Sequence, residues 1–249
     1  IPLDNMGFTT HNLQELKKIV SKPYGLFFVC GPTGSGKTTT LHSILKYLNR
    51  DDTKIWTAED PVEITQKGLR QVQINVKAGL TFPIIMRSFL RADPDIIMVG
   101  EMRDLETVSI AIETAETGHL VFGTLHTTTA ASTIDRIIDQ FPVDRQSQVR
   151  VMLAESLKGV IAQVLCRRIG GGRVAAKEVL LSIPAVSNLI REGKTFQIPS
   201  IMQTNRKTGM VLLNDALLEL AVRGICLSAV PPHHASRGLN PTSDFSYTR

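Results

Sequence analysis

Residues 31–38 combine the residue types and the spacing that bind phosphate groups. They read Gly-Pro-Thr-Gly-Ser-Gly-Lys-Thr and fit the pattern G-x-x-x-x-G-K-[ST] at every specified position. Gly34 and Gly36 let the backbone turn so that successive N–H groups face phosphate oxygens. Lys37 is placed to reach the β- and γ-phosphates, and the Thr38 hydroxyl to bind Mg²⁺. The segment therefore predicts a nucleotide site formed by Gly31, Pro32, Thr33, Gly34, Ser35, Gly36, Lys37, Thr38 and Thr39.

The residues on either side supply the elements that such a loop needs. Residues 26–30 form an apolar run that predicts a buried strand, and residues 37–48 predict a helix. The helix N-terminus adds partial positive charge beside the phosphates. The alternative is a glycine-rich turn with a surface lysine, and the order of strand, loop and helix argues against it.

Carboxylates follow two further apolar runs. Residues 54–58 predict a strand that delivers Glu59, Asp60 and Glu63 at its end, and residues 96–99 predict a central parallel strand that ends at Glu101. The carboxyl ends of strands in an open parallel sheet are where ligands bind. Glu101 is therefore a candidate to lie near the metal and to activate water, with Glu63 as the next candidate. The alternative is a core strand that ends at an ordinary surface acid.

Two histidines bracket the apolar run at residues 120–125, which predicts another strand. A histidine in such a position can be structural or catalytic. Because a strand rises about 3.3 Å per residue, His119 and His126 lie too far apart to contact the same phosphate in one subunit. We assign His126, at the carboxyl end, to the nucleotide, and His119 to a structural or inter-subunit role.

The remaining pattern predicts an α/β fold. Strands and helices alternate from residue 26 to residue 138, which is typical of a right-handed, doubly wound, mainly parallel sheet. Residues 69–76 read as a short exposed strand or hairpin. Helices are expected at residues 10–21, 82–90, 105–117, 130–139 and 144–167. We expect a first domain at residues 1–167, a small and mainly helical domain at 168–228, and a disordered or non-native tail at 229–249. The second domain should hold a strand at 174–181 and helices at 184–192 and 212–224.

Composition excludes several classes of protein. The 249 residues are 43% hydrophobic and 20% charged, as in globular domains. No apolar run approaches the roughly 20 residues that cross a bilayer. The three cysteines are widely spaced, which predicts neither disulfides nor a zinc site and fits a reducing cytosol. The net charge of +5 comes without an aromatic-rich basic stripe, so nucleic acid is not expected as a partner. Because the first residue is Ile1, we expect the chain to be part of a longer protein.

Four motifs together resemble the secretion ATPases of type IV pilus and type II secretion systems. They lie at residues 31–40, 58–63, 90–104 and 117–127, and the likeness spans about residues 10–228. Within that family, residues 135–142 and 184–194 are similar to the pilus-retraction, or twitching-motility, branch. The absence of a four-cysteine zinc element agrees with that branch. Residues 71–75 and 79–82 instead resemble the pilus-assembly and type II secretion branch.

The resemblance implies an ATP-hydrolysing motor with a RecA-like P-loop core and a helical C-terminal domain. Such motors use ATP and Mg²⁺ and form homo-hexamers. They lie in the cytoplasm, peripheral to the inner membrane, where they act on a pilus platform protein. A nucleic-acid-dependent RecA-like motor and a ring component without turnover are the rival interpretations.

The resemblance also implies roles for individual residues. Glu101 corresponds to the catalytic glutamate that also lies near the metal, and Arg136 to an arginine near the nucleotide. The acidic box and the histidine box that contact nucleotide correspond to Glu59, Asp60, Glu63, His119 and His126. An N-terminal PAS-like domain and the arginines it lends to a neighbouring subunit are implied for the family and are not contained in this sequence.

Overall fold

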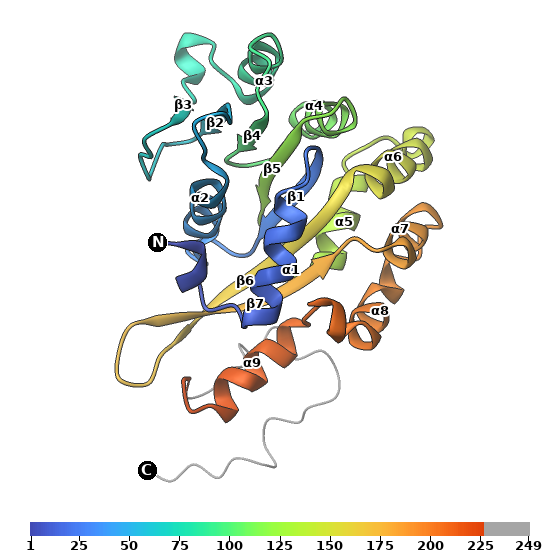
Figure 1. Cartoon of the computed structure of the whole chain (residues 1–249). Helices are drawn as coiled ribbons and strands as arrows, with labels where there is room; N and C mark the ends of the chain where they lie inside the picture. Colours follow the sequence, from blue (N-terminus) through green and yellow to red (C-terminus); the bar gives the residue numbers. More distant parts are fainter. Residues whose placement is uncertain (227–249) are drawn as a thin grey trace.

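The computed structural model, which describes residues 1–226, is built on one seven-stranded sheet (Figure 1). Its strand order is β3-β2-β4-β5-β1-β6-β7. Every neighbouring pair is parallel except β6 and β7, which are antiparallel. The strands are β1 Gly25–Cys30, β2 Ile55–Glu59, β3 Leu69–Gln73, β4 Ile96–Val99, β5 Leu120–Leu125, β6 Leu157–Arg167 and β7 Arg173–Leu181. The mainly parallel α/β sheet expected from the sequence is confirmed.

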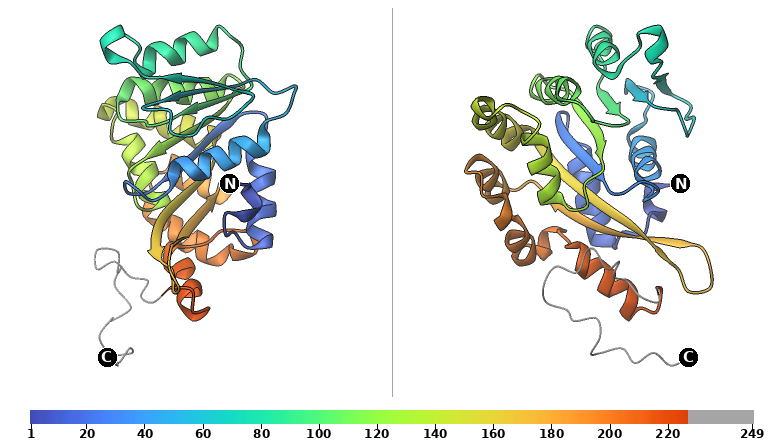
Figure 2. Two further views of the ribbon diagram at one scale, coloured as in Figure 1. Left: turned by 90° about the vertical axis from the view of Figure 1, so that its left-hand side faces the viewer. Right: turned by 180° about the vertical axis from the view of Figure 1, so that it is seen from behind.

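Helices cover both faces of the sheet (Figures 1 and 2). One face carries α1 Thr10–Val20 and α2 Lys37–Leu48. The other carries α4 Leu105–Glu116, α5 Ala130–Ile138 and α6 Val143–Ser156, and α3 Phe82–Leu90 packs against α4. After β7 come α7 Pro184–Arg191, α8 Ile198–Thr204 and α9 Leu213–Val222. Within residues 1–226, none of the helices combines the length and apolar character required to cross a membrane.

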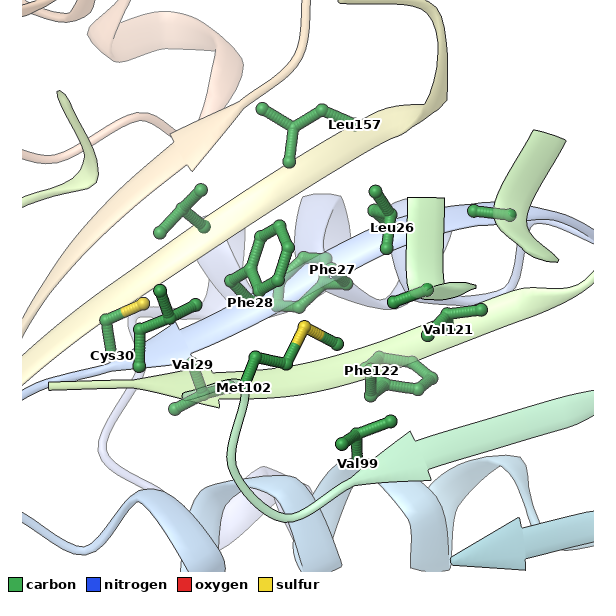
Figure 3. Packing of buried hydrophobic residues seen from close by; sticks show 14 of the residues in the cluster. Leu26, Phe27, Phe28, Val29, Cys30, Val99, Met102, Val121, Phe122 and Leu157 are labelled. Atoms are coloured by element: carbon green, nitrogen blue, oxygen red, sulfur yellow. The ribbon is translucent and has the colours of Figure 1, made fainter. Parts of the chain in front are cut away.

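The core is centred on β1 and its neighbour β5 (Figure 3). All six residues of each strand are buried. The rings of Phe27 and Phe122 pack with their centroids 5.8 Å apart. Met102, just after β4, lies against Gly123, where any Cβ would collide with the methionine side chain. This packing fixes the end of β4 next to β5, and Glu101 precedes Met102 in the chain.

Residues 157–167 form strand β6, so the expectation of one helix at residues 144–167 is wrong. The helix α6 ends at Ser156, and the chain continues as a strand between β1 and β7. A strand in that position is buried on both faces, and its apolar run fits helical spacing equally well. Periodicity therefore could not distinguish the two, although the β-branched pair Val160 and Ile161 favours a strand.

Two other expectations need adjustment. The strand expected at residues 69–76 is present as β3, but it pairs in parallel with β2 rather than forming a hairpin. The expected domain boundary after residue 167 lies in the turn between β6 and β7, and β7 belongs to the same sheet as the preceding strands. On the outer side of β7, Val179 exchanges two backbone hydrogen bonds with Val211. The division into two domains stays a prediction, and the tail at 229–249 lies outside the described residues.

Candidate nucleotide site

The phosphate-binding loop lies between the end of β1 and the start of α2, as the motif predicts. Gly34 and Gly36 have φ values of +76° and +87°, in the left-handed region that favours glycine. Gly31 has a φ of +147°, and a Cβ at this position would collide with the Gln163 carbonyl oxygen and the Ser35 hydroxyl. Helix α2 begins directly at Lys37, without a side-chain cap, so its first N–H groups point into the loop.

Lys37 lies at the centre of this loop. Its Nζ donates hydrogen bonds to the carbonyl oxygens of Gly31, at 2.9 Å, and Pro32, at 3.1 Å. Burial lowers the pKa of the ammonium, and the negative charges of Glu101 and Glu63 act in the opposite direction. Lys37 therefore places its charge where the loop closes, which is where phosphate groups would bind.

A chain of polar contacts, which we call the Lys37–Arg103 chain, connects the loop to the ends of β5 and β4. Lys37 Nζ lies 3.5 Å from His126 Nδ1, and His126 Nε2 lies 2.9 Å from Glu101 Oε1. The other carboxylate oxygen of Glu101, Oε2, lies 2.5 Å from Arg103 Nη2. Because β1, β5 and β4 are neighbours, their carboxyl ends bring the predicted Lys37, His126 and Glu101 together.

The electrostatic surroundings keep Glu101 ionised. Burial raises its pKa, but the hydrogen bond from Arg103 and the positive charges of His126 and Arg103 outweigh burial, so the pKa is lowered overall. The side chain of Glu101 is 18% exposed. A carboxylate that is ionised and reachable by water can accept a proton from it, which is the chemistry required of a general base.

The three acidic residues after β2 occupy different environments. Glu59 is buried, and its carboxylate accepts hydrogen bonds from Thr57 at 2.6 Å and Gln71 at 3.0 Å and lies 3.1 Å from His42 Nε2. Burial raises the pKa of Glu59, but hydrogen bonds from His42, Gln71 and Thr57 lower it overall. Its hydrogen-bond partners are thus side chains of the protein itself, and the expected contact of Glu59 with nucleotide stays a prediction. Asp60 and Glu63 are exposed at the edge of the site, where their charges act on Arg103 and Lys37 respectively.

Two predicted residues make no polar contact with the Lys37–Arg103 chain. His119 Nδ1 lies 3.3 Å from the Thr114 carbonyl oxygen, and the His119 carbonyl accepts a hydrogen bond from Gly25 at the start of β1. His119 is therefore at the opposite end of the sheet from the phosphate-binding loop. The side chain of Arg136 is exposed on α5 and forms no ion pair or hydrogen bond with the described residues 1–226. A structural or inter-subunit role for His119 and a place near the nucleotide for Arg136 both stay predictions.

Two residues of the site were not predicted. Arg103 belongs to one of the family motifs, but its pairing with Glu101 depends on the turn after β4. Gln163 is 1% exposed in β6, and its Nε2 donates a hydrogen bond to the Ser35 carbonyl oxygen at 2.6 Å. Its Oε1 accepts one from the Thr40 hydroxyl at 2.8 Å. The polar residue in an otherwise apolar run was the available signal, and reading that run as a helix concealed it.

The donor groups near the loop fit a magnesium ion that is bound together with a nucleotide. The Thr38 hydroxyl, in the first turn of α2, is partly exposed and makes no hydrogen bond within the described residues. The described part of the chain holds no cluster of three or more His, Cys, Asp or Glu side chains able to bind a metal. Mg²⁺ commonly has one or two protein ligands and takes the rest from phosphates and water, so Thr38 and Glu101 suit it.

The chain resembles proteins of known families in both sequence and structure. A family model described as "Type II/IV secretion system protein" matches residues 1–173. The chain is 51% identical over 219 residues to the type IV pilus retraction ATPase PilT of Pseudomonas aeruginosa, covering 85% of this chain and 63% of that protein. It is 45% identical over 251 residues to a twitching motility protein of Neisseria gonorrhoeae, covering 96% of this chain and 66% of that protein.

Solved structures agree with these relatives. A crystal structure of the pilus retraction motor PilT with bound ADP superimposes with a TM-score of 0.80 at 43% identity, covering 90% of this chain and 64% of that one. The chain thus spans somewhat less than two thirds of the length of each of these three proteins. The family model covers more than half of the chain. This chain belongs to the Type II/IV secretion system protein family.

Proposed function

We propose that this chain is the ATP-hydrolysing subunit of a motor that retracts type IV pili. The observation that carries the proposal is the position of Glu101, which is ionised and reachable by water and is linked through His126 to Lys37 of the phosphate-binding loop. The likeness to the retraction ATPase PilT and to a twitching motility protein extends over 85% and 96% of the chain, which supports retraction.

The residues of the site divide the work of phosphoryl transfer. The loop N–H groups and the first turn of α2 hold the phosphates, and Lys37 neutralises their charge. Glu101 accepts a proton from the attacking water, while His126 and Arg103 hold the carboxylate in place. Thr38 and Glu101 would hold Mg²⁺, which supplies charge neutralisation at the phosphate oxygens. Asp60 and Glu63 line the edge of the site and are available to orient water.

The proposal includes the setting in which this motor acts. It forms a homo-hexamer in the cytoplasm, at the inner face of the membrane, where it acts on a pilus platform protein and not on nucleic acid. Residues 71–75 and 79–82, which resemble the pilus-assembly branch, favour assembly as the second candidate direction. A deletion strain distinguishes the two: loss of a retraction motor leaves pili but abolishes twitching, whereas loss of an assembly motor removes the pili.

The test of the proposed chemistry is magnesium-dependent phosphate release by the Glu101→Gln variant. The amide is isosteric and cannot accept the proton, so we expect nucleotide affinity to persist while turnover falls by roughly 10²-fold or more. Lys37→Ala should instead lose nucleotide binding, measured by titration with a fluorescent ATP analogue.

Two exposed residues outside the site provide matched controls. Glu106→Gln changes an acid that pairs with Arg87, and Lys46→Ala changes a lysine in the last turn of α2. Both controls should behave as the unchanged protein. Near-normal phosphate release by Glu101→Gln would transfer the base role to Glu63, and unchanged affinity of Lys37→Ala would contradict the assignment of the loop.

A further inference from the structure

Gln163 connects the centre of the sheet to the phosphate-binding loop and to the helix that follows it. The side chain is 1% exposed, in the part of β6 that runs beside the end of β1. Its amide nitrogen donates to the Ser35 carbonyl oxygen at 2.6 Å, and its amide oxygen accepts from the Thr40 hydroxyl at 2.8 Å. Ser35 is inside the loop and Thr40 is in α2, so one side chain contacts both elements.

The backbone of the loop also packs closely on Gln163. A Cβ at Gly31 would collide with the Gln163 carbonyl oxygen, and a Cβ at Gly36 would lie 3.3 Å from its Nε2. The loop therefore contacts the same residue near its start and near its end. A contact at both ends restricts where the intervening peptide groups can lie.

The hydrogen bond to the Ser35 carbonyl also determines the direction of a neighbouring donor. In a trans peptide the C=O bond and the N–H bond of the next residue lie in the same plane and point in opposite directions. Because the Ser35 carbonyl points to Gln163, the N–H of Gly36 points away from Gln163. N–H groups that face the hollow of such a loop are the groups that bind phosphate oxygens.

We propose that Gln163 is a positioning residue for nucleotide binding, which orients the Ser35–Gly36 peptide so that its N–H faces the phosphates. The inference rests on the proposed function, because it assigns Gln163 to that same nucleotide site. The amide side chain of Gln163 offers a donor to the Ser35 carbonyl and an acceptor to the Thr40 hydroxyl at once, at every pH. Gln163 acts through the backbone of the loop and does not contact the nucleotide itself.

The test compares Gln163→Glu and Gln163→Leu in the whole chain, by titration with fluorescent analogues of ATP and ADP between about pH 6 and pH 8.5. Gln163→Leu removes both hydrogen bonds, and we expect affinity to fall by about tenfold, as for the loss of one to two hydrogen bonds. Thr114→Val is the matched control, because Thr114 is 1% exposed and its hydroxyl bonds only within α4, to the Ile110 carbonyl. The control should bind both analogues normally.

The Gln163→Glu variant supplies a readout that a merely structural role would not produce. The carboxylate introduced by this change, when ionised, would place a negative oxygen against the Ser35 carbonyl, whereas the protonated acid restores a donor there. Because burial raises the pKa of a carboxyl group, protonation should occur within the tested range. The affinity of Gln163→Glu, divided by that of the unchanged protein at the same pH, should therefore recover several-fold as the pH falls.

The titrations distinguish failure of the positioning role of Gln163 from failure of the proposed function. A ratio that is constant and close to one for Gln163→Glu at every pH would overturn the positioning role, even if Gln163→Leu fails to fold. An unchanged protein that binds neither analogue would overturn the proposed function itself. Normal binding by the unchanged protein and by Thr114→Val, with a pH-dependent ratio for Gln163→Glu, would support both.

Discussion

The two carboxylate oxygens of Glu101 contact different side chains, His126 and Arg103, and both are more exposed than Glu101. The side chains of His126 and Arg103 are 45% and 66% exposed, and that of Glu101 is 18% exposed. Water screens ion pairs with exposed partners, so each contact contributes little net stability. Water or a metal ion can therefore replace either contact at little cost in stability. This suits a carboxylate that acts on water and lies near a metal ion.

The two histidines around β5 should have different effects on catalysis. We expect His126→Asn to lower turnover strongly without changing the melting temperature, because His126 contacts Glu101 and Lys37 and nearly half of its side chain is exposed. His119→Asn should affect turnover less, because its ring contacts Thr114 at the far end of the strand. Phosphate-release assays and thermal melts on both variants test this. A larger catalytic loss at His119, with both proteins folded, would contradict the assignment.

The sequence predicted the residues of the site unequally well, for physical reasons. The positions of Lys37 and Glu101 could be predicted, because local spacing and strand direction determine where these residues lie. Glu59 was expected at the nucleotide because it also ends a strand. Its contacts with His42 and Gln71 could not be predicted, because no local pattern reveals how the elements that carry them pack. Gln163 depends on the order of strands in the sheet, which brings β6 beside β1.

Strand β6 is the element whose type could not be predicted from its own residues. Its neighbours in the sheet decide its conformation, because burial between β1 and β7 favours a strand over the helix that the spacing also permits. The helices and strands before residue 138 were predicted correctly from local patterns alone, without knowledge of the strand order. Strand β3 differs only in pairing in parallel with β2.

Gly159 in β6 should not tolerate a side chain. A Cβ at this position would lie 2.7 Å from the Phe27 ring and 2.9 Å from the Leu180 carbonyl oxygen. We expect Gly159→Ala to lower the free energy of unfolding by about 1–3 kcal/mol, the usual cost of overpacking a core. Urea denaturation measures the loss. A variant as stable as the unchanged protein would mean that the ring of Phe27 can move aside.

Lys177 in β7 makes the stability of the chain depend on pH. Its Nζ donates a hydrogen bond to the Met6 carbonyl oxygen and lies 4.7 Å from the centre of the Phe8 ring. Burial lowers the pKa of Lys177 from 10.5 to about 8. The folded state therefore releases this proton more easily than the unfolded state does. Stability falls as the pH decreases from about 10.5 to about 8, and the penalty is constant below that.

The Lys177→Met variant should remove this dependence. Relative to the unchanged protein, it should gain free energy of unfolding, on the order of 3 kcal/mol, when the pH is lowered from about 10.5 to about 7. Urea denaturation of both proteins at several pH values gives the difference, and the lost hydrogen bond adds only a constant. If the difference in free energy of unfolding between the two proteins does not change with pH, burial does not lower the pKa of Lys177.

At the scale of the whole molecule, one buried carboxylate joins parts of the chain that are far apart in sequence. Glu178 in β7 is 5% exposed. One of its oxygens accepts a hydrogen bond from the N–H of Ala130, at the start of α5, and the other from the N–H of Leu213, at the start of α9. The carboxylate thus connects the sheet to one helix from each side of the expected domain boundary.

We expect Glu178→Ala to lower the free energy of unfolding by about 3 kcal/mol, because it leaves two buried N–H groups without acceptors. Chemical denaturation followed by circular dichroism provides the measurement. Glu192→Ala is the control, since Glu192 forms an exposed ion pair with Lys194 and should change stability little. Equal losses in the two variants would mean that α5 and α9 find other acceptors.

The two borders of the sheet have a consequence for self-assembly. A strand with unpaired backbone groups is a template for another chain, and proteins avoid this with short or covered borders. Here β3 has five residues, with the charged Arg70 exposed, and β7 is paired with Val211 at Val179 and packed against α9. In the proposed hexamer, contacts between copies of this chain should therefore join side chains of helices and loops and should not extend the sheet from one subunit to the next.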